Sequence, residues 1–160
     1  MTSHGAAGTP PPGALAERLG TATSRLNALL RHHLAQAEIT ISQARTLGTL
    51  ATRGPQRITE LALIEQVAQP TMSVLLTRLD EHGLIERRAD PANPKATLVS
   101  INKAGLELWR SIVALRTNLF GAGLTLLSAS ERKSLEAALP ALEHLVDQLQ
   151  GSGAEQHARR

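Results

Sequence analysis

Short polar side chains recur on one side of a leucine-rich segment near the middle of the chain. Gln69, Ser73 and Thr77 are spaced four residues apart, so a helix would place them on one face. Amide and hydroxyl groups can hydrogen-bond to base edges in the major groove of DNA. The stripe carries no Lys or Glu, whereas a helix face that is merely solvated usually carries long charged side chains. We therefore predict that the stripe contacts DNA bases.

Histidines are the other residues whose spacing could support chemistry. His32 and His33 are adjacent, and adjacent side chains on a helix point about 100° apart, so they cannot chelate one ion. No two histidines are four residues apart, and the HExxH motif of helical zinc sites is absent. The chain also contains no cysteine, which excludes zinc–thiolate sites and thiol nucleophiles. We predict that the protein is not an enzyme and has neither a metal site nor a cofactor.

The composition limits the kind of nucleic acid that the chain could bind. Lys and Arg number 17 against 14 acidic residues, and the net charge of +3 is spread evenly along the chain. Trp109 and Phe120 alone are too few for the stacking surfaces that single-stranded DNA or RNA requires. Double-stranded DNA therefore remains the candidate. The sequence begins without a signal peptide and has no apolar run of membrane-spanning length, which predicts a cytoplasmic protein with no membrane partner.

Leucines at intervals of three and four predict long helices on both sides of the middle segment. One ladder occupies residues 15–37, and another, at 135–149, follows a capping box of Ser128 and Glu131. Between them, Asn102 is a suitable cap for a third long helix. We expect Pro140 to bend the last helix without dividing it. Ladders of this kind need a partner helix, so we predict that these segments form a dimer.

Shorter helices are predicted in the middle segment. Ser42 is a plausible cap for a helix that stops at Gly54-Pro55, and a second helix is expected over residues 59–67. A third helix is expected over residues 69–82, and Gly83 then suits a left-handed C-terminal cap. Its inner side is apolar, so the predicted DNA-contacting stripe lies on the opposite face.

After the third helix, the pattern changes from helical to alternating. Residues 84–89 and 97–101 predict a two-stranded hairpin with a seven-residue tip. The predicted fold class is mainly α: a winged helix-turn-helix with a small β-hairpin wing, embedded between long dimerisation helices. The predicted domains are a disordered tail (1–13), a dimerisation helix (14–39), the winged helix-turn-helix (40–101), dimerisation helices (102–150) and a second disordered tail (151–160).

The predicted winged helix-turn-helix is similar to the MarR (multiple antibiotic resistance regulator) family of dimeric winged-helix transcription factors. The resemblance extends over residues 14–150, because the flanking helices lie where that family has its dimerisation domain. The matching motifs, in chain order, are Leu61-Ala62, Gln69-Pro70-Thr71-Met72, Arg78-Leu79, Gly83-Leu84-Ile85 and Asp90-Pro91.

The resemblance implies a regulator, in our hypothesis a repressor, that binds a palindromic operator as a homodimer. Its two recognition helices would enter major grooves roughly 34 Å apart. It further implies that a small aromatic or phenolic ligand weakens DNA binding by changing the spacing of the two DNA-binding heads.

We predict two sets of DNA-binding residues. The recognition helix supplies Gln69, Pro70, Thr71, Ser73, Val74, Thr77 and Arg78. The second set, which belongs to the wing or contacts the DNA backbone, is Arg57, Arg87, Arg88, Asn93 and Lys95. Arg78 is expected to contact a phosphate or to bond to Asp80 or Glu81, and Arg87 and Arg88 point to opposite faces of a strand, so at most one faces DNA.

The wing tip departs from the family pattern. The family carries Asp-x-Arg at the tip, and Asn93-Pro94-Lys95 stand in its place here. A lysine suits the minor groove less well than the planar guanidinium of arginine. Lys95 is therefore expected either to contact a phosphate or to make no DNA contact.

A function of another class also fits the weak basic charge. The winged helix could belong to a helical protein-interaction module that binds a protein partner. DNA binding through phosphates would weaken steeply with added salt, and an affinity independent of salt would favour the protein partner. An enzyme has the least support, because the acidic residues of the middle segment are scattered.

Overall fold

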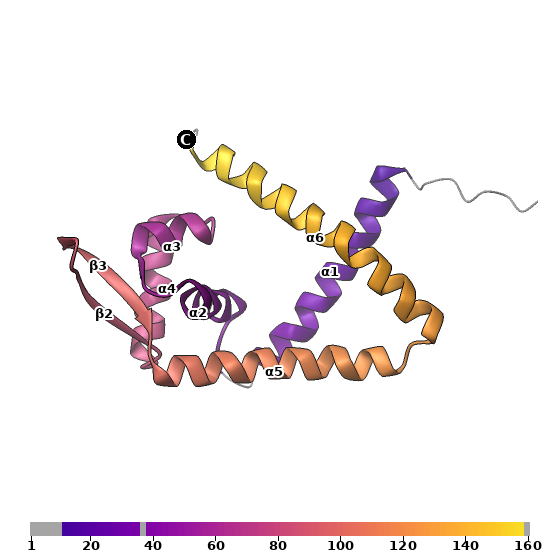
Figure 1. The fold of residues 1–160 in the computed structure, drawn as a ribbon, viewed down its shortest axis with the longest axis horizontal. Coiled ribbons are helices and arrows are strands. Elements are labelled where there is room, and N and C mark those ends of the chain that lie inside the picture. Colours follow the sequence, from indigo (N-terminus) through magenta and orange to yellow (C-terminus); the bar gives the residue numbers. More distant parts are fainter. Residues whose placement is uncertain (1–10, 36–37, 159–160) are drawn as a thin grey trace, which may run out of the picture. The chain divides into compact units, whose positions relative to one another are not determined.

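A computed structural model of the chain describes residues 11–35 and 38–158, apart from the side chains of residues 94, 95 and 150–158. It is mainly helical with a small antiparallel sheet, which confirms the predicted fold class (Figure 1). The chain divides into two compact units, residues 1–41 and 42–160, which we describe separately. The elements are α1 (Pro12–Ala35), α2 (Ile41–Arg53), β1 (Gln56–Arg57), α3 (Ile58–Ile64), α4 (Gln69–Glu81), β2 (Ile85–Asp90), β3 (Asn93–Ile101), α5 (Lys103–Thr125) and α6 (Ala129–Ala158).

Helix α1 makes up most of the first unit. It begins at Pro12, inside the predicted N-terminal tail, because proline fits the first turn of a helix, where its missing N–H is not needed. Residues 1–10 of that predicted tail lie outside the described residues. Leu15, Leu26 and Leu29 of the predicted ladder are exposed in the single chain, so this part of the apolar face is not covered by the chain itself.

The core of the second unit lies between α2, α3, α4 and the sheet. Its fully buried side chains are Leu47, Leu50, Leu61, Met72, Leu76, Leu79, Val99 and Thr46. Three of them, Met72, Leu76 and Leu79, recur at intervals of four and three along α4, which confirms the predicted inner face of this helix. Burial of each such side chain contributes about 1.5–3 kcal/mol, so α4 is firmly attached along its inner side.

A polar network at the end of α3 fixes the turn that leads into α4. The carboxylate of Glu65 is buried and accepts hydrogen bonds from the Arg45 Nε and the Thr49 hydroxyl, both on α2. Arg45 Nη2 also donates to the Glu65 carbonyl oxygen at 2.7 Å. The next residue, Gln66, has a positive φ of 54°. Hydrogen bonds from two α2 side chains therefore fix the turn between α3 and α4, and the turn sets the direction in which α4 starts.

The two ends of α4 follow local rules. Pro70 occupies its first turn, where no helical hydrogen bond is lost. At the other end, Gly83 has φ 65°, and the amides of Gly83 and Leu84 donate to the carbonyls of Asp80 and Leu79. This is a Schellman motif, which requires a left-handed residue and confirms the predicted role of Gly83.

The prediction for the start of α2 was wrong. The helix begins at Ile41, so Ser42 lies inside its first turn and is not the N-terminal cap. Its carbonyl oxygen accepts a hydrogen bond from the Thr46 hydroxyl at 3.1 Å. A serine can be accommodated in a first turn as well as at a cap, and the residue type alone does not distinguish the two positions.

The sheet contains one more strand than the hairpin that was predicted. Its order is β1-β3-β2, and β1 pairs antiparallel with β3, with Gln56 opposite Val99 and Arg57 opposite Leu98. A strand of two residues is too short to show alternation, so it could not be recognised from the hydrophobic pattern. β1 joins the start of α3 to the base of the wing.

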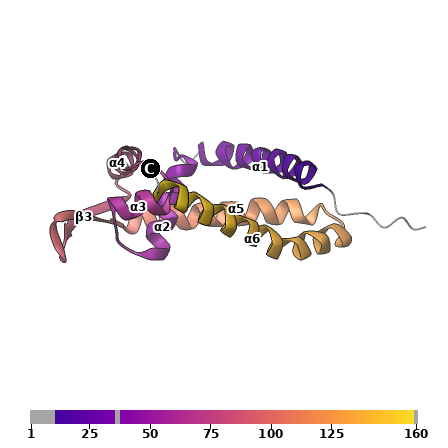
Figure 2. The ribbon, with the colours of Figure 1, turned by 90° about the horizontal axis from the view of Figure 1, so that it is seen from above.

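The wing is longer and its tip shorter than predicted. β2 reaches Asp90 and β3 starts at Asn93, so only Pro91 and Ala92 connect the strands, instead of seven residues. The register shifts after the Ala89–Thr97 pair, and the next pair is Asp90–Asn93. In both views the hairpin projects beyond α3 and α4 (Figures 1 and 2).

Two long helices follow the wing. Asn102 caps α5 as predicted, because its Oδ1 accepts a hydrogen bond from the Gly105 amide at 2.9 Å. Its Nδ2 donates to the Gly83 carbonyl at 2.8 Å, which ties the start of α5 to the end of α4. Gly105 is buried there, and a Cβ at this position would overlap the carbonyl oxygen of Leu84.

Helix α6 confirms one prediction and corrects another. The capping box is present: the Ser128 amide donates to Glu131 Oε2 at 2.8 Å, and the Glu131 amide donates to the Ser128 hydroxyl at 3.2 Å. The helix is continuous across Pro140, as predicted. It then extends to Ala158, where a disordered tail from residue 151 was predicted, since the Ala, Glu and Gln residues after Gly153 favour helix and outweigh the two glycines.

Candidate nucleic-acid interface

The outer side of α4 is an exposed surface of short side chains. Gln69, Pro70, Thr71, Thr77 and Arg78 are exposed, and Ser73 is half-buried. The structure thus brings all seven predicted recognition-helix residues, Val74 included, to the side of α4 that is not attached to the core.

Two details of this face bear on base contacts. The side chain of Val74 is 57% exposed although it is apolar, so it offers a methyl surface among polar groups. The Thr77 hydroxyl donates to the Ser73 carbonyl oxygen at 3.0 Å. Its oxygen lone pairs therefore remain available to accept a hydrogen bond from a base, whereas its proton is already used.

The cations near α4 differ in what they contact. Arg87 Nε lies 3.1 Å from Asp80 Oδ2, so this arginine of β2 is paired with α4. Arg88 Nη2 lies 3.6 Å from Glu86 Oε2 and 3.4 Å from the Ser100 hydroxyl. Within residues 11–35 and 38–158, Arg78 forms no ion pair, and neither of the predicted acidic partners, Asp80 or Glu81, is bonded to it. Arg78 is therefore the guanidinium on α4 that is available to a phosphate.

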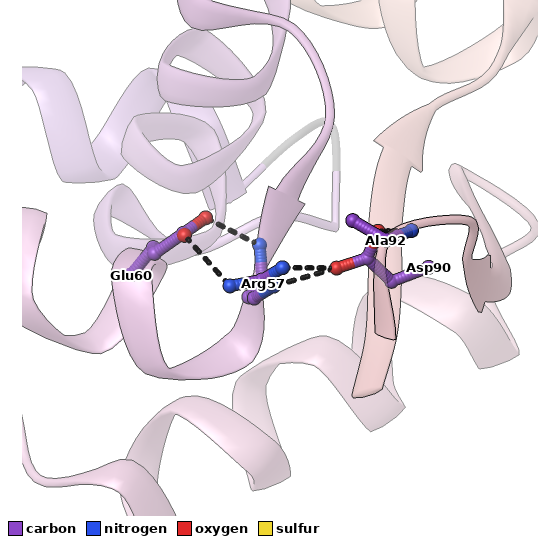
Figure 3. A network of polar contacts seen from close by, with 4 residues as sticks. All are labelled: Arg57, Glu60, Asp90 and Ala92. Carbon is purple, nitrogen blue, oxygen red and sulfur yellow. Dashed lines mark hydrogen bonds and ion pairs between the residues drawn. The ribbon is translucent and has the colours of Figure 1, made fainter. Parts of the chain in front are cut away.

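Arg57 lies at the junction between the sheet and α3, where it is engaged by two carboxylates (Figure 3). Its Nε donates to Asp90 Oδ2 at 2.7 Å, and its Nη2 donates to the same oxygen. Glu60 accepts a hydrogen bond from the Arg57 backbone amide at 3.0 Å, which caps the start of α3. The Arg57 side chain is still 38% exposed.

Asp90 connects this junction to the wing. Its side chain is 6% exposed, and its Oδ1 accepts a hydrogen bond from the Ala92 amide at 2.9 Å. The Ala92 amide and the Arg57 guanidinium both stabilise the charged form, so the pKa of Asp90 is lowered from its ordinary value. The same bond to Asp90 raises the pKa of Arg57. The pair is therefore charged on both sides at neutral pH.

The pair of Arg57 and Asp90 was not predicted, because the two residues are 33 positions apart in the chain. From the sequence, Arg57 was expected to contact a phosphate, and Asp90 was noted only as part of a motif. A sign of the connection was available in the family-like Asp90-Pro91 dipeptide, but nothing local indicated which cation it would meet.

The wing tip is described only in part. Asn93 is exposed and pairs with Asp90 in the ladder. The backbone of Lys95 belongs to β3, and its side chain lies outside the described part of the chain. Asn93 and Lys95 therefore both belong to β3, directly after the turn of Pro91 and Ala92.

The surface beside α4 carries hydrogen-bonding and methyl groups. In the described ranges, 11–35 and 38–158, no group of three or more His, Asp or Glu residues is arranged to hold a metal ion. No helix in those ranges is long and apolar enough to cross a membrane. The exposed face of α4 presents hydrogen-bonding and methyl groups, and the β2–β3 hairpin projects beside it.

Comparisons with known proteins agree with this geometry. Residues 39–97 match the model of the MarR family. The chain is 31% identical over 134 residues to an uncharacterised HTH-type transcriptional regulator of Mycobacterium bovis, covering 84% of this chain and 94% of that protein. A regulator of the same description from Mycobacterium leprae is 30% identical over the same shares.

Solved structures share the fold. The crystal structure of RV1404 from Mycobacterium tuberculosis superposes with a TM-score of 0.78 at 27% identity, over 87% of this chain and 96% of that one. A mutant of Staphylococcus aureus MepR, bound to an oligodeoxyribonucleotide, gives a TM-score of 0.64 at 21% identity, over 82% of this chain and 97% of that one.

Proposed function

The chain belongs to the MarR family of DNA-binding transcriptional regulators, and from this premise we propose that it is a repressor that binds a palindromic operator as a homodimer. The observation that carries the proposal is the exposed polar face of α4 above a fully buried apolar face. A rod attached in this way can enter a major groove without rearrangement of the core. The curated relatives are HTH-type transcriptional regulators, which favours DNA over a protein partner as the target of the winged helix.

The proposed base contacts come from the N-terminal half of α4. The Gln69 amide can pair bidentately with adenine, the Ser73 hydroxyl can serve either partner of a base pair, and Val74 can contact a thymine methyl. Arg78 lies later in the helix and is assigned to a phosphate. MepR, a protein of the same fold, has been solved bound to an oligodeoxyribonucleotide, which supports this use of the fold.

The proposed dimer is supported by apolar side chains that the single chain leaves exposed. On α6 they follow a helical stripe of Leu135, Leu139, Leu142, Leu145, Val146 and Leu149. On α5, Phe120 and Leu124 are exposed as well, and α1 contributes the ladder described above. Exposed apolar side chains along these helices of a regulator of a palindromic site are suited to a second copy of the chain.

The proposal includes release from DNA by a small aromatic or phenolic effector, for which the family resemblance is the support. Two cavities are candidates for the effector site: one of about 350 Å³ at the end of α1, lined by residues that include Arg31 and Leu34, and one of about 430 Å³, lined by residues that include Arg53 and Leu63. Neither has an aromatic side chain in its lining.

Selection of bound sequences from random DNA duplexes by the full chain tests the proposal. We expect an inverted repeat whose half-sites are centred about one helical turn apart, and an affinity that falls steeply with salt. Light scattering of the free protein should give the mass of a dimer, and a reporter placed behind the selected site should be repressed. Enrichment of no sequence, or of a single half-site by a monomer, would reject the proposal.

A further inference from the structure

The Arg57–Asp90 pair joins two parts of the winged helix that the backbone connects only indirectly. Arg57 is the last residue of β1 and immediately precedes α3, while Asp90 is the last residue of β2 (Figure 3). The carboxylate uses both oxygens: one holds the guanidinium of Arg57 and the other holds the amide of Ala92 in the tip. A single side chain thereby sets the tip relative to the start of α3.

The sheet needs such a connection at this point. The β2–β3 ladder loses its regular register directly after Ala89, so backbone pairing alone fixes the tip less firmly than the base of the hairpin. Asp90 is almost fully buried, which limits competition from water for its oxygens. The approach of Arg57 is itself fixed, because the backbone of Arg57 is paired in the sheet and also caps α3 through Glu60.

We propose that Asp90 and Arg57 are positioning residues for DNA binding, which hold the wing at a fixed angle to the recognition helix through the start of α3. This inference rests on the proposed DNA-binding function and assigns Arg57 a different role from the phosphate contact that the sequence suggested. The wing has no Asp-x-Arg pair at residues 93–95 to stiffen it, and the Arg57–Asp90 pair beside the tip supplies the constraint.

The sign of one substitution separates the two roles of Arg57. If Arg57 were a phosphate contact, Asp90→Asn would remove a competing acid, so DNA would bind more tightly and the dependence on salt would become steeper. If the pair positions the wing, Asp90→Asn weakens binding roughly tenfold, because the wing must be ordered when DNA binds. The measurement is fluorescence anisotropy of a labelled duplex that carries the selected operator, over a series of salt concentrations.

Two further variants complete the test. Arg57→Lys keeps the charge but loses the two-nitrogen grip on Asp90; we expect it to weaken binding with little change in the salt slope, whereas a phosphate contact would tolerate it. In the double variant of Arg57→Lys and Asp90→Asn, the losses should not add, since both remove one connection. Glu107→Gln, which removes an exposed acidic side chain of α5 outside the predicted DNA-binding residues, is the control and should change affinity little.

Hydrogen exchange in the free protein supplies a readout that does not depend on DNA. Exchange of the Ala92 amide should accelerate in Asp90→Asn and in Arg57→Lys, while amides in the middle of α4 keep their protection. Tighter DNA binding by Asp90→Asn, or unchanged exchange at Ala92 in both variants, would overturn the inference and leave the proposed function intact. Failure of the unsubstituted chain to bind any duplex would instead reject the proposed function, and this inference with it.

Discussion

The recognition helix and the wing are held in place by different means. α4 is fixed by three apolar side chains that the surrounding core buries completely. The wing beyond Ala89 is tied to the start of α3 by one carboxylate, which accepts hydrogen bonds from Arg57 and from the Ala92 amide. Apolar packing is spread over many contacts and does not depend on pH, whereas a charge pair is local and depends on both partners. Helix α4 is therefore held more firmly than the wing, and the wing is the part that single substitutions can move.

The largest effect is expected from removing part of the apolar hold on α4. Leu76→Ala should lower the free energy of unfolding by about 2–5 kcal/mol, because it leaves a cavity in a fully buried position. Chemical denaturation measures this. Val74→Ala, two residues away on the exposed side, is the control and should change stability by less than about 0.5 kcal/mol. Equal losses in the two variants would contradict the assignment of inner and outer faces.

A smaller effect is expected on the outer face of the same helix. Gln69→Ala or Ser73→Ala should lose about 1–3 kcal/mol of binding free energy at one base step and relax the preference there. Repeating the duplex selection with each variant identifies the affected position. A uniform loss across all sequences would show that these side chains contact the backbone and not bases.

Charge substitutions separate the helix from the wing more finely. Arg78→Gln and Lys95→Ala should each weaken all sequences alike and reduce the salt slope by about 1.8, as expected for the loss of one phosphate contact in each subunit of the dimer. The comparison between them is informative because Arg78 forms no ion pair among the described residues. If Lys95→Ala instead changes the sequence preference, the wing recognises the shape of the minor groove.

The smallest expected effect is a pH dependence of the wing tip, which is absent at neutral pH and appears in acid when Asp90 is protonated. Its pKa is lowered in the folded protein, so its contribution is fully present above the unfolded pKa and is lost as the pH falls through the folded one. We expect protection of the Ala92 amide, corrected for intrinsic exchange rates, to be constant from neutral pH to about pH 4 and to fall below it. Asp90→Asn should show no such transition. Loss of protection in the unsubstituted chain already near pH 6 would contradict the lowered pKa.

Much of α4 could be predicted because its determinants are local. The interval between Met72, Leu76 and Leu79, the glycine at the C-terminal cap and the proline in the first turn all act within a few residues. The caps of α5 and α6 at Asn102 and Ser128 follow from similarly short-range hydrogen bonds. Patterns of this range are visible in a sequence, so the exposed face of α4 was predictable as well.

The features that escaped prediction involve longer distances or weak local preferences. Pairing of β1 with β3 and of Arg57 with Asp90 brings together residues that are far apart in the chain, and nothing in either segment alone specifies its partner. The start of α2 differs from the prediction by two residues, a difference that helix propensities do not resolve. The hydrogen bond between Arg45 and Glu65, which are 20 residues apart, was not predicted for the same reason as the Arg57–Asp90 pair.

The joint between α4 and α5 has a consequence for control of the protein. Asn102 bonds to the Gly83 carbonyl and caps α5, and Gly105 leaves no space between α5 and the Leu84 carbonyl. A tilt of α5 would therefore move the C-terminal end of α4 in the same direction. Ligand binding or a subunit movement that tilts α5 would therefore reorient the winged helix as a rigid body, with no internal rearrangement of its core.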